Sequence, residues 1–138
     1  WYVLDGVYSM SGAFAHIAEL DSLVARYPQL HLYADDAQCT SWIGANGRGF
    51  TLDRLSDTSR TIVMLSLNKA FSAAGGAIIV PSETFASRIR LAGAPMMFSG
   101  PLQPPMLGAG VGTDRPRARP RARSCRASAR PARRRSGR

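Results

Sequence analysis

Lys69 is the residue whose chemistry stands out first, because it is the only lysine in the 138-residue chain. It follows an apolar run and lies among small side chains, in the sequence SLNKAFSAAGG. A partly desolvated lysine loses its proton more easily and can bond covalently to an aldehyde or ketone. The alternative is a lysine at the boundary of a core, with its stem packed and its ammonium group in water. The local sequence of Lys69 is compatible with both roles.

Two adjacent acids, Asp35 and Asp36, end another apolar run, 34 positions before Lys69. Such a pair can cap a helix, bind a metal ion, or hold the protonated nitrogen of a cofactor ring. No second cluster of Asp and His completes a metal site, and His16 and His31 fit structural roles. An acid after one strand and a lysine after a later one match the needs of pyridoxal 5'-phosphate (PLP). The acid keeps the pyridine nitrogen protonated, and the lysine holds the cofactor and moves protons.

The elements that must position these residues follow from the apolar pattern. Short apolar runs predict four strands, at residues 1–4, 31–36, 61–67 and 76–80. Residues 13–26 and 81–91 are predicted as amphipathic helices. The connection at residues 68–75 is too short for a crossover helix, so we expect an α/β fold with a mixed sheet. Ligands bind beyond the carboxyl ends of the strands in such sheets, which is where Asp35 and Lys69 fall.

The charge of +9 is distributed unevenly along the chain. Residues 1–110 hold seven Arg and Lys against eight acids, whereas residues 111–138 hold eleven Arg and only Asp114. From Gly112 onward the composition is dominated by Arg, Ala, Pro, Ser and Gly, with no hydrophobic periodicity. We therefore expect a folded segment at residues 1–110 and a disordered basic tail at residues 111–138. The tail resembles either a shifted reading frame or an arm that binds polyanions such as nucleic acid.

The cysteines and the apolar runs bear on the cellular compartment. Cys39 and Cys125 are the only cysteines, which argues against a disulfide framework and for a reducing compartment. No signal peptide and no apolar run of membrane-spanning length is visible in the sequence. These features predict a soluble, cytoplasmic protein.

Five short motifs occur in order between residues 3 and 110. They are DGVYSMSG at 5–12, DDAQ at 35–38, IGANGRG at 43–49, SLNK at 66–69 and FSGPLQPP at 98–105. This set resembles EGVFSMDG, DDAH, IGxxGRG, TxxK and FSxxxPP of the α-oxoamine synthase family of fold-type I PLP enzymes. The resemblance implies the mixed, mostly parallel sheet of the large PLP-binding domain of that fold.

The resemblance also implies roles for individual residues. Lys69 would bind PLP covalently, and Asp35 would pair with its pyridine nitrogen. Ser66 stands for a threonine that contacts the cofactor phosphate, and Ser9 matches a serine near the phenolic oxygen of the ring. Ser99 lies in a segment that, in the family, approaches the phosphate of the neighbouring subunit of a homodimer.

Gln38 departs from the family pattern, because it replaces a histidine beside the phenolic oxygen. A glutamine can hydrogen-bond that oxygen but cannot titrate near neutral pH. The family condenses an amino acid with an acyl thioester, and these are the substrates that the resemblance implies. Three alternatives stay open: an aminotransferase-like PLP enzyme, an inert truncated remnant that lacks parts of the active site, and a nucleic-acid binder that uses its basic tail.

Overall fold

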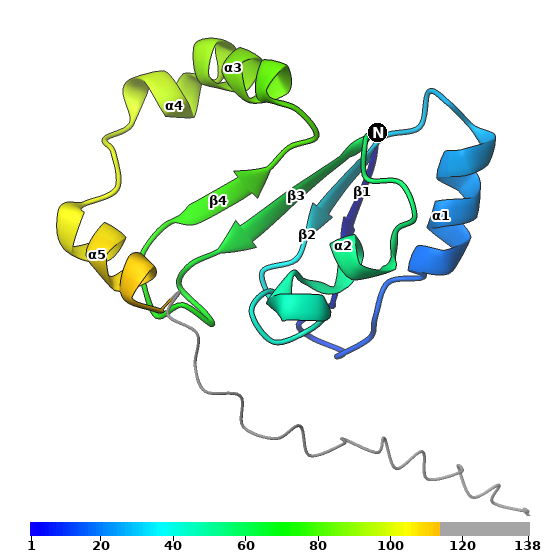
Figure 1. Cartoon of the computed structure of the whole chain (residues 1–138), viewed down its shortest axis with the longest axis horizontal. Helices are drawn as coiled ribbons and strands as arrows, with labels where there is room; N and C mark the ends of the chain where they lie inside the picture. Colours follow the sequence, from blue (N-terminus) through cyan, green and yellow to red (C-terminus); the bar gives the residue numbers. More distant parts are fainter. Residues whose placement is uncertain (114–138) are drawn as a thin grey trace, which may run out of the picture.

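The computed structural model of the protein describes residues 1–113 (Figure 1). Its elements are, in chain order, β1 (Tyr2–Asp5), α1 (Ile17–Arg26), β2 (Leu32–Asp35), η1 (Ala45–Gly47), α2 (Phe50–Arg54), β3 (Thr61–Ser66), β4 (Gly76–Ile79), α3 (Glu83–Ala92), α4 (Ala94–Phe98) and α5 (Pro104–Thr113). Helix α5 crosses the boundary that we predicted after residue 110. The predicted disorder of the basic tail lies, from residue 114 onward, outside the described residues.

The four strands form one sheet in the order β1-β2-β3-β4. The first three strands run parallel, and β4 pairs antiparallel with β3. The arrowheads in Figure 1 show this reversal, with β4 pointing back along β3. The tight connection between β3 and β4 therefore produces the mixed α/β sheet that the sequence predicted.

Helices α1 and α2 cover one face of the sheet. On β2, Leu32 and Ala34 point to this face and are fully buried, at 0% exposure. They belong to one apolar core with side chains of the neighbouring strands and of both helices, namely Leu4, Val63, Ile17, Leu20, Val24 and Phe50. The core therefore lies between the parallel strands and these two helices.

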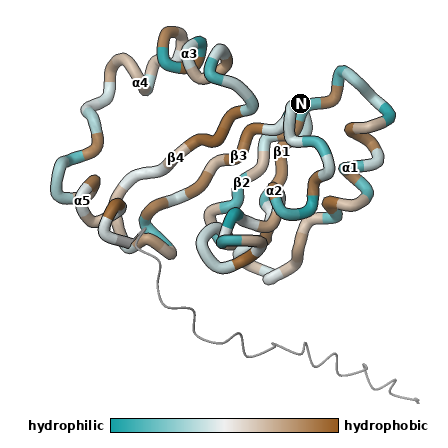
Figure 2. Tube along the Cα trace, viewed as in Figure 1, coloured by the Kyte–Doolittle hydropathy of each residue, from teal (hydrophilic) through white to brown (hydrophobic). Residues whose placement is uncertain are grey.

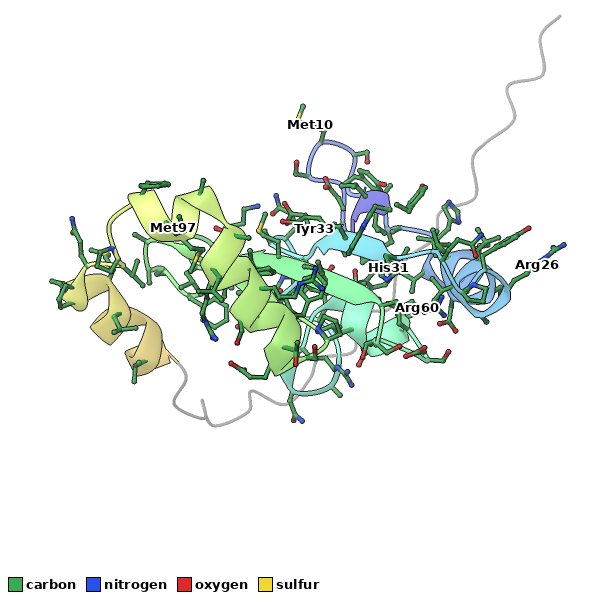
Figure 3. All side chains as sticks on the ribbon, turned by 90° about the horizontal axis from the view of Figure 1, so that it is seen from above. Met10, Arg26, His31, Tyr33, Arg60 and Met97 are labelled. Carbon is green, nitrogen blue, oxygen red and sulfur yellow. The ribbon has the colours of Figure 1, made fainter. Side chains whose placement is uncertain are left out.

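The other face of the parallel strands is more open. Tyr33 and Asp35 alternate with the buried residues of β2, and Met64 pairs in register with Asp35 on β3. Because successive side chains of a strand point to opposite sides, these three residues share a face. Figure 3 shows Tyr33 on the same side of the sheet as Met10, whose loop rises above it, and Arg60 on the other side. We call this side of the sheet the open face.

Four helices differ from the sequence prediction. The first helix begins at Ile17 rather than at residue 13, because the preceding residues pair with the loop after β1. In this pairing, Tyr8 N donates to Ala13 O at 2.9 Å and Ala15 N donates to Gly6 O at 3.0 Å. The structure also contains α2, α4 and α5, which the sequence did not predict, since each is short or lacks a clear apolar stripe.

Candidate functional site

The carboxyl ends of β1, β2 and β3 meet at one edge of the sheet, the lower edge in Figure 1. Strand β2 ends at Asp35, and Gln38 lies in the turn that follows it. Strand β3 ends at Ser66, and Lys69 follows three residues later. The loop after β1 carries Ser9. The fold thus brings five of the six predicted site residues to this edge of the sheet.

Asp35 presents a carboxylate that is only partly used. Its side chain is half-buried, and Oδ1 accepts a hydrogen bond from Ala37 N at 2.8 Å. Its second oxygen, Oδ2, has no hydrogen-bond partner within residues 1–113. Asp35 can therefore accept a further hydrogen bond from a cationic N–H group on the open face.

Asp36 has a different environment from its neighbour. It is fully buried, at 0% exposure, and both of its carboxylate oxygens accept hydrogen bonds from Thr51 in the first turn of α2. One of the first N–H groups of α2 is satisfied in this way, as a capping residue would do. No group of three or more His, Cys, Asp or Glu residues that could hold a metal occurs within residues 1–113. Of the three roles considered for the acid pair, Asp36 comes nearest to capping, although the N-cap residue of α2 itself is Gly49.

Ser66 lies on the open face at the end of β3, where it is half-buried. Its Oγ accepts a hydrogen bond from Asn68 N at 3.2 Å. The hydroxyl proton is still available to donate to an anion. This geometry is compatible with the phosphate contact that the resemblance implies.

Lys69 is exposed in the turn between β3 and β4. Its ammonium group forms no ion pair or hydrogen bond within residues 1–113, and its carbonyl accepts from Ser72 N at 3.2 Å. The partly desolvated surroundings that favour a reactive lysine are therefore not supplied by the described part of the chain. The Nζ atom of Lys69 is nevertheless accessible from solvent.

Gln38 and Ser9 border the same edge. Gln38 is half-buried, and its backbone carbonyl accepts a hydrogen bond from Trp42 Nε1 at 2.8 Å. Ser9 is exposed in a loop that closes through a bond from Gly12 N to Tyr8 O at 2.8 Å. Both residues lie in loops that directly follow strand ends, Ser9 after β1 and Gln38 after β2.

Ser99 lies apart from the other predicted residues, in the segment between α4 and α5. It is exposed, and its hydroxyl donates to the carbonyl of Pro95. With Gly75, Leu102 and neighbouring residues it lines a groove of about 600 Å³. Ser99 therefore adjoins the end of the β3–β4 connection rather than the ends of β1 and β2.

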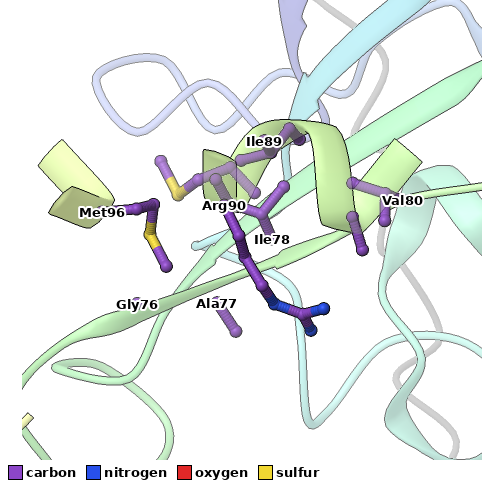
Figure 4. Close-up of a pocket in the computed structure, with 9 residues that line it drawn as sticks. Gly76, Ala77, Ile78, Val80, Ile89, Arg90 and Met96 are labelled. Atoms are coloured by element: carbon purple, nitrogen blue, oxygen red, sulfur yellow. The ribbon is translucent and has the colours of Figure 1, made fainter. Parts of the chain in front are cut away.

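An apolar pocket of about 480 Å³ lies between β4 and helices α3 and α4 (Figure 4). Figure 4 shows Ile78 and Val80 on the strand side and Ile89, Arg90 and Met96 on the helix side. None of the predicted site residues lines this pocket. We therefore define the candidate site by the chemistry of the strand ends and not by this cavity.

Sequence reasoning missed Thr51 close to the candidate site and gave Cys39 no position in the fold. Thr51 is fully buried and holds Asp36, although nothing in the sequence around it signals this contact. Cys39 is fully buried in the turn after β2, and burial raises the pKa of its thiol to about 12. The neighbouring Asp36 carboxylate acts in the same direction. A thiol with this pKa stays protonated and unreactive at neutral pH.

The donor set at this edge fits PLP. The open oxygen of Asp35 suits a pyridinium N–H, the Ser66 hydroxyl suits a phosphate, and the accessible Nζ of Lys69 suits an aldehyde carbon.

In the part of the chain that the structure describes, no helix has both the length and the apolar character needed to cross a membrane.

Comparisons with known proteins agree with this chemistry. Residues 1–116 match the family described as aminotransferase class I and II. The chain is 33% identical over 108 residues to 8-amino-7-oxononanoate synthase of Marinomonas sp. (strain MWYL1), which covers 78% of this chain and 26% of the relative. It is 32% identical over 105 residues to the mitochondrial 2-amino-3-ketobutyrate coenzyme A ligase of Mus musculus, covering 75% of this chain and 25% of that protein.

A solved structure with the same fold carries the cofactor. It is a serine palmitoyltransferase from S. paucimobilis with a bound PLP-myriocin aldimine, which superposes with a TM-score of 0.71 at 25% identity. The match covers 80% of this chain and 28% of that one. The chain spans about a quarter of the length of the curated relatives. Family match, relatives and fold together show that this chain belongs to the aminotransferase class I and II family of PLP-dependent enzymes, in its α-oxoamine synthase branch.

Proposed function

We propose that these residues serve a PLP-dependent condensation of an amino acid with an acyl thioester, of the type catalysed by 8-amino-7-oxononanoate synthase. The observation that carries the proposal is the placement of Asp35 and Lys69 after the ends of adjacent parallel strands, at one edge of the sheet. The names of the relatives, which include a coenzyme A ligase and a palmitoyltransferase, support acyl transfer as the reaction class. In this reaction the bond between Cα and the carboxylate breaks and releases CO2. A bond from Cα to the acyl carbon forms, and the thiol leaves.

Bound PLP supplies an electron-withdrawing ring that stabilises negative charge on the amino-acid carbon. Lys69 would hold the cofactor through Nζ and carry protons to and from that carbon. Asp35 would keep the ring nitrogen protonated through Oδ2, the oxygen that has no other hydrogen bond. Ser66 would donate to the phosphate.

The remaining predicted residues have supporting roles in this proposal. Gln38 would donate from its amide to the phenolic oxygen of the ring, and it would do so at every pH because an amide does not titrate. Ser9 would lie near the same oxygen. Ser99 would approach the phosphate held by the second subunit of a homodimer.

The test uses the fact that the chain has a single lysine. The full chain is mixed with PLP, reduced with borohydride and digested, and the modified peptide is identified by mass spectrometry. We expect the label on Lys69, and Lys69→Ala to lose it. Lys69→Arg is the matched control, because it keeps the charge but cannot bond covalently to the aldehyde. If the parent chain and Lys69→Ala are labelled equally, and only at the terminal amine, the proposal is contradicted.

A second candidate is that this chain is catalytically inert by itself. The exposure of Lys69 favours it, because the described residues do not desolvate the amine. The assay supplies glycine or alanine, an acyl-CoA and PLP, and measures released CO2 and free thiol. Release of both by the chain, dependent on Lys69, would exclude inertness, and formation of a 2-oxo acid instead would identify aminotransferase-like chemistry.

A further inference from the structure

The pair Asp35-Asp36 is divided between the two faces of the sheet. Asp36 N donates to Met64 O at 2.9 Å, which closes the last register pair of the β2–β3 ladder, Asp35 with Met64, so the backbone is paired up to Asp36. Side chains alternate along an extended strand. Asp35 therefore points to the open face and Asp36 to the face that α1 and α2 cover.

The Asp36 carboxylate is bound entirely by one residue of α2. Its Oδ2 accepts from Thr51 N at 2.9 Å, and its Oδ1 accepts from Thr51 Oγ1 at 2.7 Å. Both residues are fully buried, at 0% exposure, and Asp36 forms no salt bridge within residues 1–113. A buried carboxylate requires such hydrogen bonds, because its desolvation is otherwise costly.

Two glycines allow the chain to close around this carboxylate. A Cβ on Gly6 would lie 2.0 Å from Asp36 Oδ1, and a Cβ on Gly49 would lie 2.5 Å from Oδ2. Gly49 also has a φ of +97°, in the region that favours glycine. The loop after β1 and the Gly-rich loop before α2 thus pack directly against the same side chain.

A separate set of hydrogen bonds, to the backbone carbonyls of Asp35 and Asp36, holds the chain around Asp35. The carbonyl of Asp35 accepts from Gly6 N at 2.9 Å. The carbonyl of Asp36 accepts from Cys39 N and Thr40 N, both at 3.0 Å, and from Thr40 Oγ1 at 2.9 Å. These bonds shape the turn of residues 36–40, whose Ala37 N in turn holds Asp35 Oδ1.

We propose that Asp36 is a positioning residue that, through its two hydrogen bonds to Thr51, fixes the turn of residues 36–40 and thereby the carboxylate of Asp35 on the open face. The inference rests on the proposed function for the use of Asp35 by a cofactor. The division of labour between the two acids does not depend on it. Both carboxylate oxygens of Asp36 are hydrogen-bonded within the fold, whereas Oδ2 of Asp35 is available to a ligand.

The decisive variant is Thr51→Val, which removes the hydroxyl that binds Asp36 while keeping the shape of the side chain. Thr51→Ser restores the hydroxyl. Thr61→Val is the matched control, because Thr61 is a buried threonine whose Oγ1 has no hydrogen-bond partner in the described part of the chain. All three are made in the full chain, and amide hydrogen exchange is measured without cofactor at residues 37, 39 and 40 and along β3.

We expect Thr51→Val to accelerate exchange at residues 37, 39 and 40 at least tenfold, with β3 unchanged, and Thr51→Ser and Thr61→Val to match the parent chain. Unchanged exchange at the turn would overturn the inference. Equal acceleration along β3 would also overturn it, because Thr51 would then serve general stability alone. If Thr51→Val unfolds the chain, Asp36→Asn replaces it, since an amide accepts from Thr51 N and can donate to Thr51 Oγ1. The turn should then stay protected.

A second readout follows the PLP absorbance band against pH. Thr51→Val should weaken PLP binding at least tenfold and shift the pH dependence of the band in the direction produced by Asp35→Asn, and Thr51→Ser should restore both. A purely structural role would leave the band of the folded fraction unchanged, and that result would overturn the inference. Absence of any Lys69-dependent band would count against the proposed function alone, because the exchange result decides the positioning role separately.

Discussion

The first two-thirds of the described chain and its last third differ in how they bury apolar residues. Within residues 1–112, every buried side chain lies between Leu4 and Ala73. Strand β4 and helices α3 and α4 contain no buried residue, and Leu91 and Phe98 are exposed at 79% and 82%. Figure 2 nevertheless shows hydrophobic colouring on β3 and again toward the end of β4, beside α3.

This contrast shows that the two regions obtain their order from different sources. The parallel strands with α1 and α2 form a core of their own, which is the main source of folding free energy. The region after Ala73 presents apolar side chains on its surface, as is typical of surfaces that other protein parts cover. Lys69 lies near the junction of the two regions. The Asp35 side of the candidate site is therefore backed by the core, whereas Lys69 stands at the boundary of that core.

The largest difference between the regions should appear in a pair of Leu→Ala substitutions. Leu32→Ala removes a side chain of 0% exposure from β2 and should lower the free energy of unfolding by about 3 kcal/mol, through lost burial and a cavity. Leu91→Ala in α3, at 79% exposure, should change it by about 0.5 kcal/mol or less. Urea unfolding followed by circular dichroism measures both. Similar losses from the two variants would show that the regions are equally packed.

The next largest difference in the free energy of unfolding is expected between two Arg→Ala substitutions, one in each region. The Arg60 guanidinium donates to Val24 O at 2.7 Å and to Tyr27 O at 3.0 Å, which satisfies the end of α1. Arg60→Ala should therefore cost about 2 kcal/mol. Arg90 pairs with Glu83 at 2.9 Å, but both side chains are largely exposed, so Arg90→Ala should cost about 0.5 kcal/mol. The same unfolding measurement applies, and an equal cost at both positions would contradict the contrast.

A smaller and local effect is expected at the start of α3. Ser82 Oγ accepts from Phe85 N at 3.2 Å and caps the helix. Ser82→Ala should destabilise α3 by about 1 kcal/mol, seen as faster amide exchange within α3. The urea midpoint of the core should stay unchanged, because α3 contributes no buried residue. Ser87→Ala, in the same helix, is the control. A lowered core midpoint in Ser82→Ala would show that α3 is coupled to the sheet.

The smallest effect near neutral pH concerns Cys39, whose pKa is raised to about 12 by burial. Because the thiol has a higher pKa in the folded state, its contribution to stability is fully present at pH values below the unfolded-state pKa of 9.0. This contribution is lost as the pH rises toward about 12. Stability should therefore not depend on Cys39 between neutral pH and about pH 9, and it should fall above that. Alkylation of the Cys39 peptide, followed by mass spectrometry, should be slow in the native chain and fast in urea. Rapid native alkylation would contradict the burial.

The sequence alone predicted the mixed sheet and the strand ends at which Asp35 and Lys69 lie. Short apolar runs bounded by polar residues indicate strands, and a connection as short as residues 68–75 permits only an antiparallel return. Parallel strands end at the same edge of a sheet, and the structure adds that the strands of Asp35 and Ser66 are parallel neighbours. The PLP-binding roles of these residues stay predictions that the resemblance supplies.

Only the tertiary structure decided what distinguishes the two acids. The sequence shows Asp35 and Asp36 as neighbours with equal chemistry, and strand alternation requires only that they point to opposite faces. Which face is covered depends on where α1 and α2 pack. The partner of Asp36 is Thr51, which lies 15 positions away in a helix that the sequence did not predict. Burial and long-range hydrogen bonds are properties of the assembled fold, and so the structure makes Asp36 part of the core and leaves Asp35 open to a ligand.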